Sequence, residues 1–126
     1  MKPSELKVSY LKANLKKGES YAGLILGKNG EPDYHLVLLP GDAQDVTWDQ
    51  AKAFAKKAGG ELPTRREQSL LFANLKEEFK GTWYWSGEAH SDARYAWYQS
   101  FYGGYLGSDR ALSQLRARAV RRLILS

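Results

Sequence analysis

Two four-residue segments carry the signature of a helix N-terminus, and they constrain the fold of this chain more than any other feature. The segments are Thr47-Trp48-Asp49-Gln50 and Thr64-Arg65-Arg66-Glu67. In such a capping box the threonine hydroxyl accepts a hydrogen bond from the backbone N–H three residues on, and the Gln or Glu side chain accepts one from the threonine N–H. We therefore expect one helix over residues 48–58, ended by Gly59-Gly60, and a second that begins at residue 65 and stops before Gly81.

Two short apolar runs ahead of these helices predict a β-hairpin. The runs span residues 21–26 and 34–39, and the segment between them contains Asn29-Gly30 and Pro32. Asn-Gly adopts positive φ at little cost and proline fixes the φ of the returning chain, so the two runs can pair as antiparallel strands.

Beyond Gly81 the chain becomes rich in aromatic residues and is punctuated by glycine. This pattern predicts antiparallel strands over residues 82–86, 95–102 and 117–125, with loops over residues 87–94 and 103–114 between them. Together with the hairpin and the two helices, these strands predict an α+β fold.

The chain has 126 residues and is expected to build one hydrophobic core, because two cores would each be near the size at which burial barely offsets chain entropy. Apolar residues recur at helical spacing within residues 4–17, and Gly18 stands where a helix would stop. We interpret residues 1–17 as an N-terminal extension that contains a short helix, and residues 18–126 as a single domain.

The chain contains no cysteine, which excludes disulfides, thiolate metal sites and a cysteine nucleophile. Its N-terminus lacks the apolar run and small-residue cleavage site of a signal peptide, and no apolar stretch approaches the length of a membrane span. We therefore expect a protein of a reducing compartment that is not secreted by a signal peptide and has no membrane partner.

Arginine is confined to the second half of the chain. All eight arginines follow Pro63, five of them fall between Arg110 and Arg122, and the formal net charge is +5. Such a bias favours either contacts with nucleic acid or another polyanion, or structural ion pairs with acids such as Asp33, Asp45 or Glu67. Because no Gly-rich or helical recognition motif accompanies the arginines, we prefer the structural interpretation and keep phosphate contact as the alternative.

The titratable residues form no catalytic or metal-binding pattern. His35 and His90 are far apart and share no ligand spacing with a third His or a carboxylate. His90 lies in a polar segment beside Glu88 and Asp92, so it is the better functional candidate of the two. We predict no catalytic residue, no metal site and no cofactor, and interpret the chain as a non-enzyme.

Strand alternation sorts the aromatic residues of the second half into two sets. Within the strand over residues 82–86, Trp83 and Trp85 lie on one face. Within the strand over residues 95–102, Trp97 and Phe101 likewise lie on one face. We expect this Trp/Phe set to pack against the helices and the remaining positions to point elsewhere. The candidate ligand-binding residues are then Tyr98, Ser100, Tyr102, Tyr105, Ser108 and Arg110, together with His90. Exposed tyrosine with small polar neighbours and arginine is typical of adaptable binding surfaces, whereas burial of some tyrosines in a second small core is the alternative.

Several segments, taken in order along the chain, resemble one protein family. Among them are Tyr21-Ala22-Gly23-Leu24-Ile25-Leu26-Gly27, Leu62-Pro63-Thr64-Arg65-Arg66-Glu67-Gln68 and Trp83-Tyr84-Trp85-Ser86. Over residues 18–124 the chain resembles short bacteriophage and prophage proteins related to the Lcl C-terminal domain, a branch of the C-type-lectin-like superfamily. The resemblance implies two helices flanking a twisted antiparallel sheet, paired first and last strands, and a ligand face on the central strands and loops of the second half.

The calcium-dependent sugar site of that superfamily is not expected here. Glu31-Pro32-Asp33 lies in the N-terminal hairpin instead of a second-half loop, and Trp97 is followed by Tyr98-Gln99 instead of the oxygen ligands that calcium requires. An enzyme related to the formylglycine-generating branch is the least favoured alternative, because its chemistry needs cysteines and this chain has none.

The resemblance therefore implies a noncatalytic phage or prophage binding module whose Tyr/Arg-rich face takes a protein or another macromolecule. The alternative is an intracellular host-takeover or anti-defence protein that binds a host protein or nucleic acid through its basic C-terminal half. These functions place the chain on the virion or in the host cytoplasm, and a homo-oligomer is compatible with both.

Overall fold

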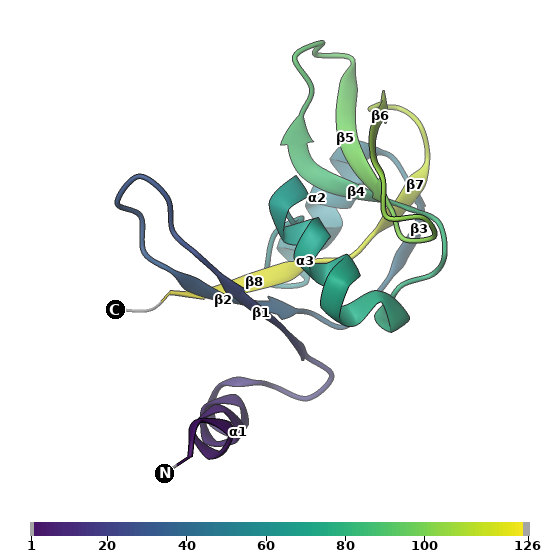
Figure 1. Ribbon diagram of the computed structural model, residues 1–126. Helices are drawn as coiled ribbons and strands as arrows, with labels where there is room; N and C mark the ends of the chain where they lie inside the picture. The colour runs from purple at the N-terminus through teal and green to yellow at the C-terminus, as the bar shows by residue number, and fades with distance from the viewer. Residues whose placement is uncertain (1, 125–126) are drawn as a thin grey trace.

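The computed structural model describes residues 2–124 and shows an α+β fold with two sheets (Figure 1). The helices are α1 Pro3–Asn14, α2 Trp48–Lys57, α3 Arg65–Leu75 and the short 3₁₀ turn η1 Lys76–Glu78. The strands are β1 Ser20–Ile25, β2 Tyr34–Leu38, β3 Ala43–Val46, β4 Trp83–Ala89, β5 Tyr95–Ser100, β6 Leu106–Arg110, β7 Leu115–Ala117 and β8 Val120–Ile124. The small sheet has the order β1-β2-β8, and the large sheet has the order β3-β7-β4-β5-β6.

Both predicted capping boxes are confirmed. The Thr47 N–H donates to Gln50 Oε1 at 3.0 Å, and the Gln50 N–H donates to Thr47 Oγ1 at 3.3 Å. Thr64 and Glu67 form the same reciprocal pair at 2.9 and 3.1 Å. The first of the two helices ends at Lys57, near its predicted end. The second is shorter than predicted, because α3 ends at Leu75 and the 3₁₀ turn η1 follows it.

The predicted N-terminal hairpin is also confirmed, whereas the expected pairing of the first and last strands is wrong. β1 pairs antiparallel with β2, and Asn29 and Gly30 in the connection both have positive φ, 54° and 83°. The last strand, β8, pairs with β2, which makes β2 the central strand. Residues 36–38 of β2 are at most 1% exposed, and such a continuous buried run suits a strand with neighbours at both edges and cover on both faces.

The large sheet contains three strands that the sequence pattern does not predict, namely β3, β6 and β7. β3 and β7 are only four and three residues long and pair with each other. β7 also pairs with β4 in parallel, so the large sheet is mixed and not antiparallel throughout as expected. β6 lies inside the segment predicted as a loop over residues 103–114. The strand predicted over residues 117–125 corresponds to β8 of the small sheet, which begins later, at Val120, whereas Ala117 is the last residue of β7 in the large sheet. Leu125 lies outside the described residues.

Both faces of the large sheet are covered, α2 lying against one face and α3 against the other (Figure 1). On the α2 side, Trp85 packs in a cluster with Ala51 and Ala55 of the helix. On the α3 side, Phe101 packs in a cluster with Leu71 of the helix. Of the Trp/Phe set predicted to form the core, Trp85 and Phe101 are 0% and 1% exposed and confirm the prediction. Trp83 is partly buried on the α2 side, whereas Trp97 is half-buried and belongs to neither cluster, so the prediction is not met for Trp97.

The helix expected in the N-terminal extension is present as α1, which lies beside the small sheet (Figure 1). It ends at Asn14, earlier than predicted, and none of its residues is buried. The ring of Tyr10 lies 4.7 Å from that of His35, and Arg121 Nη2 donates to the Asn14 carbonyl at 2.6 Å. Among residues 2–124, no helix is both long and apolar enough to cross a membrane.

Candidate functional site

The residues predicted to bind a ligand lie on β5, on β6 and in the turn between these strands, apart from His90 in the β4–β5 loop. Tyr102 and Tyr105 are 79% and 51% exposed, and Ser108 and Arg110 on β6 are also exposed. His90 is half-buried, and its ring lies 4.9 Å from that of Trp97.

Tyr98 and Ser100 do not point away from the core, so this part of the expected surface is wrong. Tyr98 is 7% exposed, and its ring is stacked 4.5 Å from that of Trp83 in the cluster on the α2 side. Burial accordingly raises the pKa of Tyr98. Ser100 is 1% exposed, and its hydroxyl oxygen accepts hydrogen bonds from the N–H groups of Tyr102 and Gly103, so it shapes the turn after β5.

The reason for the error is that helices cover both faces of the sheet. As expected from alternation, Tyr98 projects from the face of the sheet opposite to that of Trp97 and Phe101. That second face is covered by α2, so Tyr98 is buried against the helix. Tyr98 is therefore buried, as the alternative interpretation expected, but in the same cluster as Trp83 and Trp85 and not in a separate small core.

The exposed residues of β6 point to the α3 side of the sheet. Leu106, Ser108 and Arg110 pair with Gln99, Trp97 and Tyr95 of β5, and directly paired residues project from the same face. Tyr105 lies on the other side, where its hydroxyl accepts a hydrogen bond from Trp83 Nε1 at 3.0 Å. The predicted site residues thus divide between two faces of the sheet.

An arginine that the sequence analysis did not select lies beside these β6 residues. The guanidinium of Arg65, the first residue of α3, lies 4.3 Å from the centre of the Trp97 ring. Its Nε and its backbone N–H both donate to Glu88 Oε2 at 2.8 Å. Cation–π contact and a charge-assisted bond together hold this guanidinium in one place.

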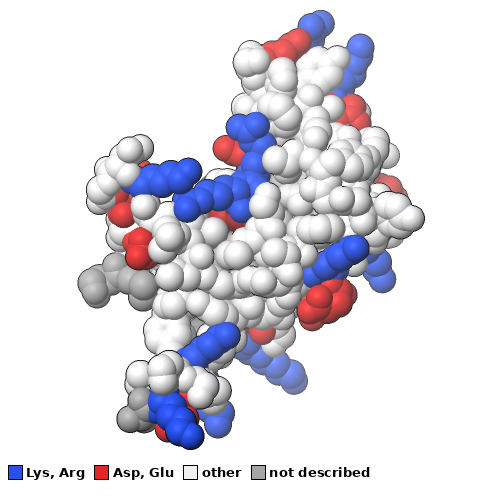
Figure 2. Space-filling model, viewed as in Figure 1, with Lys and Arg blue, Asp and Glu red and all other residues white. Residues whose placement is uncertain are grey.

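We call the resulting surface the β6 face. It consists of Arg65, Arg66, Ser69, Glu88, Trp97, Leu106, Ser108 and Arg110. A shallow hollow of about 310 Å³ opens on it between α3 and β6. Figure 2 shows Lys and Arg atoms gathered between the β1–β2 hairpin and the beginning of α3, beside a mainly uncharged area over the rest of that helix.

The position of Arg65 and Arg66 in the first turn of α3 is itself a signal in the sequence. The helix dipole disfavours cations at an N-terminus by about 0.3–1 kcal/mol each at an exposed site. Glu88 offsets this cost for Arg65. Arg66 is exposed, and within residues 2–124 it makes no ion pair. Arg66 is therefore a cation without a partner among the described residues, and its guanidinium can bind an anionic group of a ligand.

The C-terminal arginines contact the protein itself, as the structural interpretation predicts. Arg122 pairs with Glu67, one of the expected acids, but the other partners differ from Asp33 and Asp45. The pairs are Arg116 with Asp42, Arg121 with Glu19, and Arg118 with the carbonyls of Leu39 and Glu78. Of the five arginines between positions 110 and 122, Arg110 is the one that stays exposed.

The ion pair between Arg122 and Glu67 lies at the core, because the Glu67 side chain is fully buried. Burial opposes its ionisation, but hydrogen bonds from Arg122, from the Tyr34 hydroxyl and from the Thr64 N–H outweigh burial and lower its pKa. Burial and the bond to Glu67 in turn raise the pKa of Tyr34 to about 12. This carboxylate is fully buried and satisfied, and is therefore structural.

The β6 face combines cations, hydroxyls and an indole, which is a set of groups suited to holding a ligand. Among residues 2–124, no group of three or more His, Cys, Asp or Glu side chains could hold a metal ion. The nearest histidine, His90, accepts a hydrogen bond at Nδ1 from the Asp92 N–H at 3.0 Å, which ties it into its own loop. A search with protein-family models finds none that matches this chain, and a search of curated proteins finds no significant relative.

Proposed function

We propose that this chain is a noncatalytic phage or prophage binding module with a C-type-lectin-like scaffold, and that the β6 face is its ligand face. The scaffold part of the proposal rests on the resemblance together with the α+β fold, in which helices flank a twisted sheet. The ligand face keeps Ser108, Arg110 and the neighbouring His90 from the predicted set and adds Arg65, Arg66 and Trp97.

The observation that carries the proposal is the fixed guanidinium of Arg65. Trp97 beneath it and Glu88 beside it hold this side chain in place before any ligand arrives. Ordering a long side chain at an interface costs about 0.5–1.5 kcal/mol, so a pre-ordered arginine favours binding. Arginine and tryptophan are also the residue types that most often dominate the energy of protein interfaces.

The ligand that suits this face is a protein with acidic side chains. Arg66 and Arg110 are exposed cations, and Leu106, which lines the same hollow as Arg66, is 43% exposed and offers apolar contact. Nucleic acid is the less favoured ligand, because four of the five C-terminal arginines are already engaged with protein groups. A host protein bound inside the cell, as in the anti-defence alternative, would use the same face, so the proposal covers both the virion and the host cytoplasm.

The test is affinity capture from bacterial lysate, with and without nuclease, followed by binding measurements on the purified partner. The informative variant carries Arg66→Glu and Arg110→Glu. Its matched control carries Lys12→Glu and Lys57→Glu, which make the same change in net charge at exposed positions elsewhere. We expect the face variant to bind at least about tenfold more weakly, as loss of charge-assisted bonds predicts, and the control to bind like the unmodified protein.

Equal losses in the two variants would show that only overall charge matters, and no loss in either would remove the β6 face from the proposal. Capture that disappears with nuclease would establish the nucleic-acid alternative. A further variant, Tyr102→Ala with Tyr105→Ala, tests whether the exposed tyrosines of the β5–β6 turn extend the face.

A further inference from the structure

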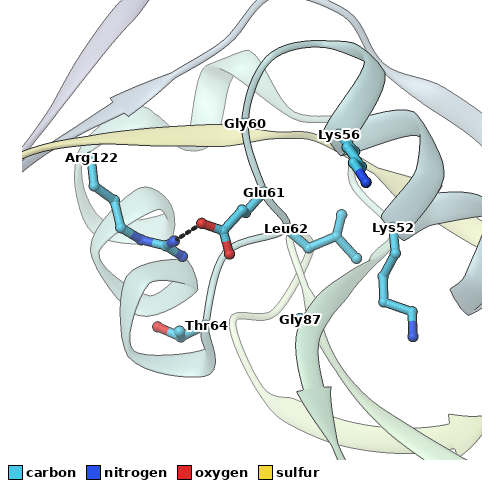
Figure 3. Close-up of a pocket in the computed structure, with 8 residues that line it drawn as sticks. All are labelled: Lys52, Lys56, Gly60, Glu61, Leu62, Thr64, Gly87 and Arg122. Atoms are coloured by element: carbon cyan, nitrogen blue, oxygen red, sulfur yellow. Dashed lines mark hydrogen bonds and ion pairs between the residues drawn. The ribbon is translucent and has the colours of Figure 1, made fainter.

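A second, larger hollow lies between α2, the α2–α3 loop, β4 and β8 (Figure 3). It adjoins the β6 face, because Thr64 and Gly87 line it and the next residues, Arg65 and Glu88, line the hollow of that face. Its volume is about 540 Å³, which is within the range of small-molecule sites. The residues that give it chemical character are Lys52, Lys56, Glu61, Leu62, Gly87 and Arg122. Figure 3 shows Arg122 and Glu61 on one side of the hollow, the two lysines on the other, and Leu62 between them.

Glycine and a buried leucine form the wall between the two sides. Leu62 is 5% exposed, so it presents only a small apolar surface. A Cβ at Gly87 would lie 3.1 Å from the Leu62 carbonyl oxygen, and a Cβ at Gly60 would lie 2.2 Å from the Val120 carbonyl oxygen. Glycine at these positions therefore allows the backbone segments that border the hollow to approach each other closely.

One side of the hollow carries excess negative charge. Arg122 uses Nε and Nη2 to bind the buried carboxylate of Glu67, and it uses Nη1 to bind Glu61 Oε1 at 2.9 Å. One guanidinium therefore faces two carboxylates. The Glu61 side chain is 75% exposed, and among residues 2–124 its Oε2 atom has no hydrogen-bond partner. Glu61 can thus accept bonds from a cationic ligand group.

The other side carries excess positive charge. Lys52 and Lys56 lie one turn apart on α2. The Lys52 ammonium lies 3.6 Å from the Trp48 ring centre and 3.2 Å from Asp49 Oδ1, so its charge is partly compensated. Lys56 is exposed in the last turn of α2, where the helix dipole favours a cation, and no ion pair among the described residues engages it.

We propose that this hollow binds a small zwitterion, with a carboxylate at Lys56 and Lys52, an ammonium at Glu61, and a methylene chain across Leu62. Glu61 and Lys56 line the same hollow without forming an ion pair with each other, although both are described. A ligand with one charge would satisfy one side and leave the other unchanged. A linear ω-amino acid satisfies both, and so does a short peptide whose termini carry the two charges.

The test uses 6-aminohexanoate as the probe, with hexanoate and hexylamine as single-charge controls, and follows the Leu62 methyl and Gly87 amide signals by NMR. We expect saturable shifts at both residues and a Kd for 6-aminohexanoate about tenfold below that of either control, since it makes one further charge-assisted contact. Shifts that do not saturate, or equal affinities for 6-aminohexanoate and hexanoate, would overturn the proposal.

Two single variants assign the charges. We expect Glu61→Gln to lower the affinity for 6-aminohexanoate to that for hexanoate, and Lys56→Ala to lower it to that for hexylamine. Lys57→Ala is the matched control, since it removes the adjacent exposed lysine outside the hollow and should leave the Kd unchanged. An equal loss in Lys57→Ala would show a nonspecific charge effect and refute the site. The variant with Arg66→Glu and Arg110→Glu should bind 6-aminohexanoate like the unmodified protein. The proposal for this hollow can therefore be refuted without refuting the proposal for the β6 face, and the reverse also holds.

Discussion

Replacing Arg122 by alanine tests the ion pair that links the last strand to α3. In the folded protein Arg122 makes two hydrogen bonds to Glu67, at 2.6 and 2.8 Å. The Glu67 side chain is 0% exposed and the Arg122 side chain 25% exposed. The variant therefore leaves a carboxylate buried without its counter-charge, although Glu67 keeps the hydrogen bonds from Tyr34 and Thr64.

Breaking a buried ion pair from one side costs about 3–5 kcal/mol. Because Arg122 is a quarter exposed and two donors to Glu67 remain, we take the lower end, about 3 kcal/mol. An unfolding entropy near 2.1 cal/mol/K per residue amounts to about 0.26 kcal/mol/K for this chain, so the expected fall in Tm is about 11 °C. Arg66→Ala, the same chemical change at an exposed site, should cost less than about 0.5 kcal/mol.

The dependence on pH distinguishes loss of charge compensation from loss of packing. In the unmodified protein the pKa of Glu67 lies below its ordinary value of 4.5, so its stabilising contribution is present at neutral pH and is lost as pH falls through the lowered pKa. Without Arg122, burial dominates and raises the pKa of Glu67, so the variant regains stability as pH falls through that raised pKa. The deficit of Arg122→Ala should therefore shrink between pH 7 and pH 4.

The assay is urea unfolding at both pH values, followed by tryptophan fluorescence. Adding Glu67→Gln to Arg122→Ala removes the uncompensated charge, and we expect it to recover part of the loss at pH 7 and to abolish the pH dependence. A deficit below about 1 kcal/mol, or one of equal size at pH 7 and pH 4, would refute this account of Glu67.

Two further predictions concern the caps and the buried tyrosines. Thr64→Ala removes the hydroxyl of a confirmed capping box and should lower the free energy of unfolding in urea by about 1 kcal/mol, whereas Thr64→Ser should not. Burial, with a hydrogen bond to Asp42, raises the pKa of Tyr84 to about 12, so the stability gained from this neutral phenol is present below pH 10 and lost as pH rises towards 12. Ultraviolet titration of Tyr84→Phe should lack one of the latest-titrating phenols, and retention of that step would contradict the assignment.

Features of the fold encoded by neighbouring residues could be predicted from the sequence. The capping boxes at Thr47 and Thr64 and the turn at Asn29-Gly30 each depend on a few consecutive side chains, so they were predictable without knowledge of the remainder. β3 pairs with β7, and β7 lies between β3 and β4, so both depend on partners distant in the sequence. Neither strand has an alternating pattern long enough to identify it. The pairing of β8 with β2 is likewise decided by burial of β2 on both faces.

The candidate site shows the same division. Alternation separated Tyr98 from Trp97 correctly, but it could not show that α2 covers the Tyr98 side, because that depends on helix placement. Arg65 and Trp97 are 32 positions apart and meet only when α3 crosses the sheet, so their contact had no local signal. The sequence does contain one signal for this surface. Two arginines follow the capping box at Thr64, although the dipole disfavours cations at a helix N-terminus, and such residues are candidates for contacts with a ligand or a distant side chain.

The arginines of the last segment also decide when this chain can finish folding. Their bonds join residues separated by 55 positions for Arg122 and Glu67, 74 for Arg116 and Asp42, 79 for Arg118 and Leu39, and 102 for Arg121 and Glu19. During synthesis, β2, α3 and β4 emerge from the ribosome before β7 and β8. Until β7 and β8 follow, Glu67 and Asp42 lack their arginine partners. Contacts of such long sequence separation slow folding, so we expect these ion pairs to form only after the arginine-rich segment has been translated.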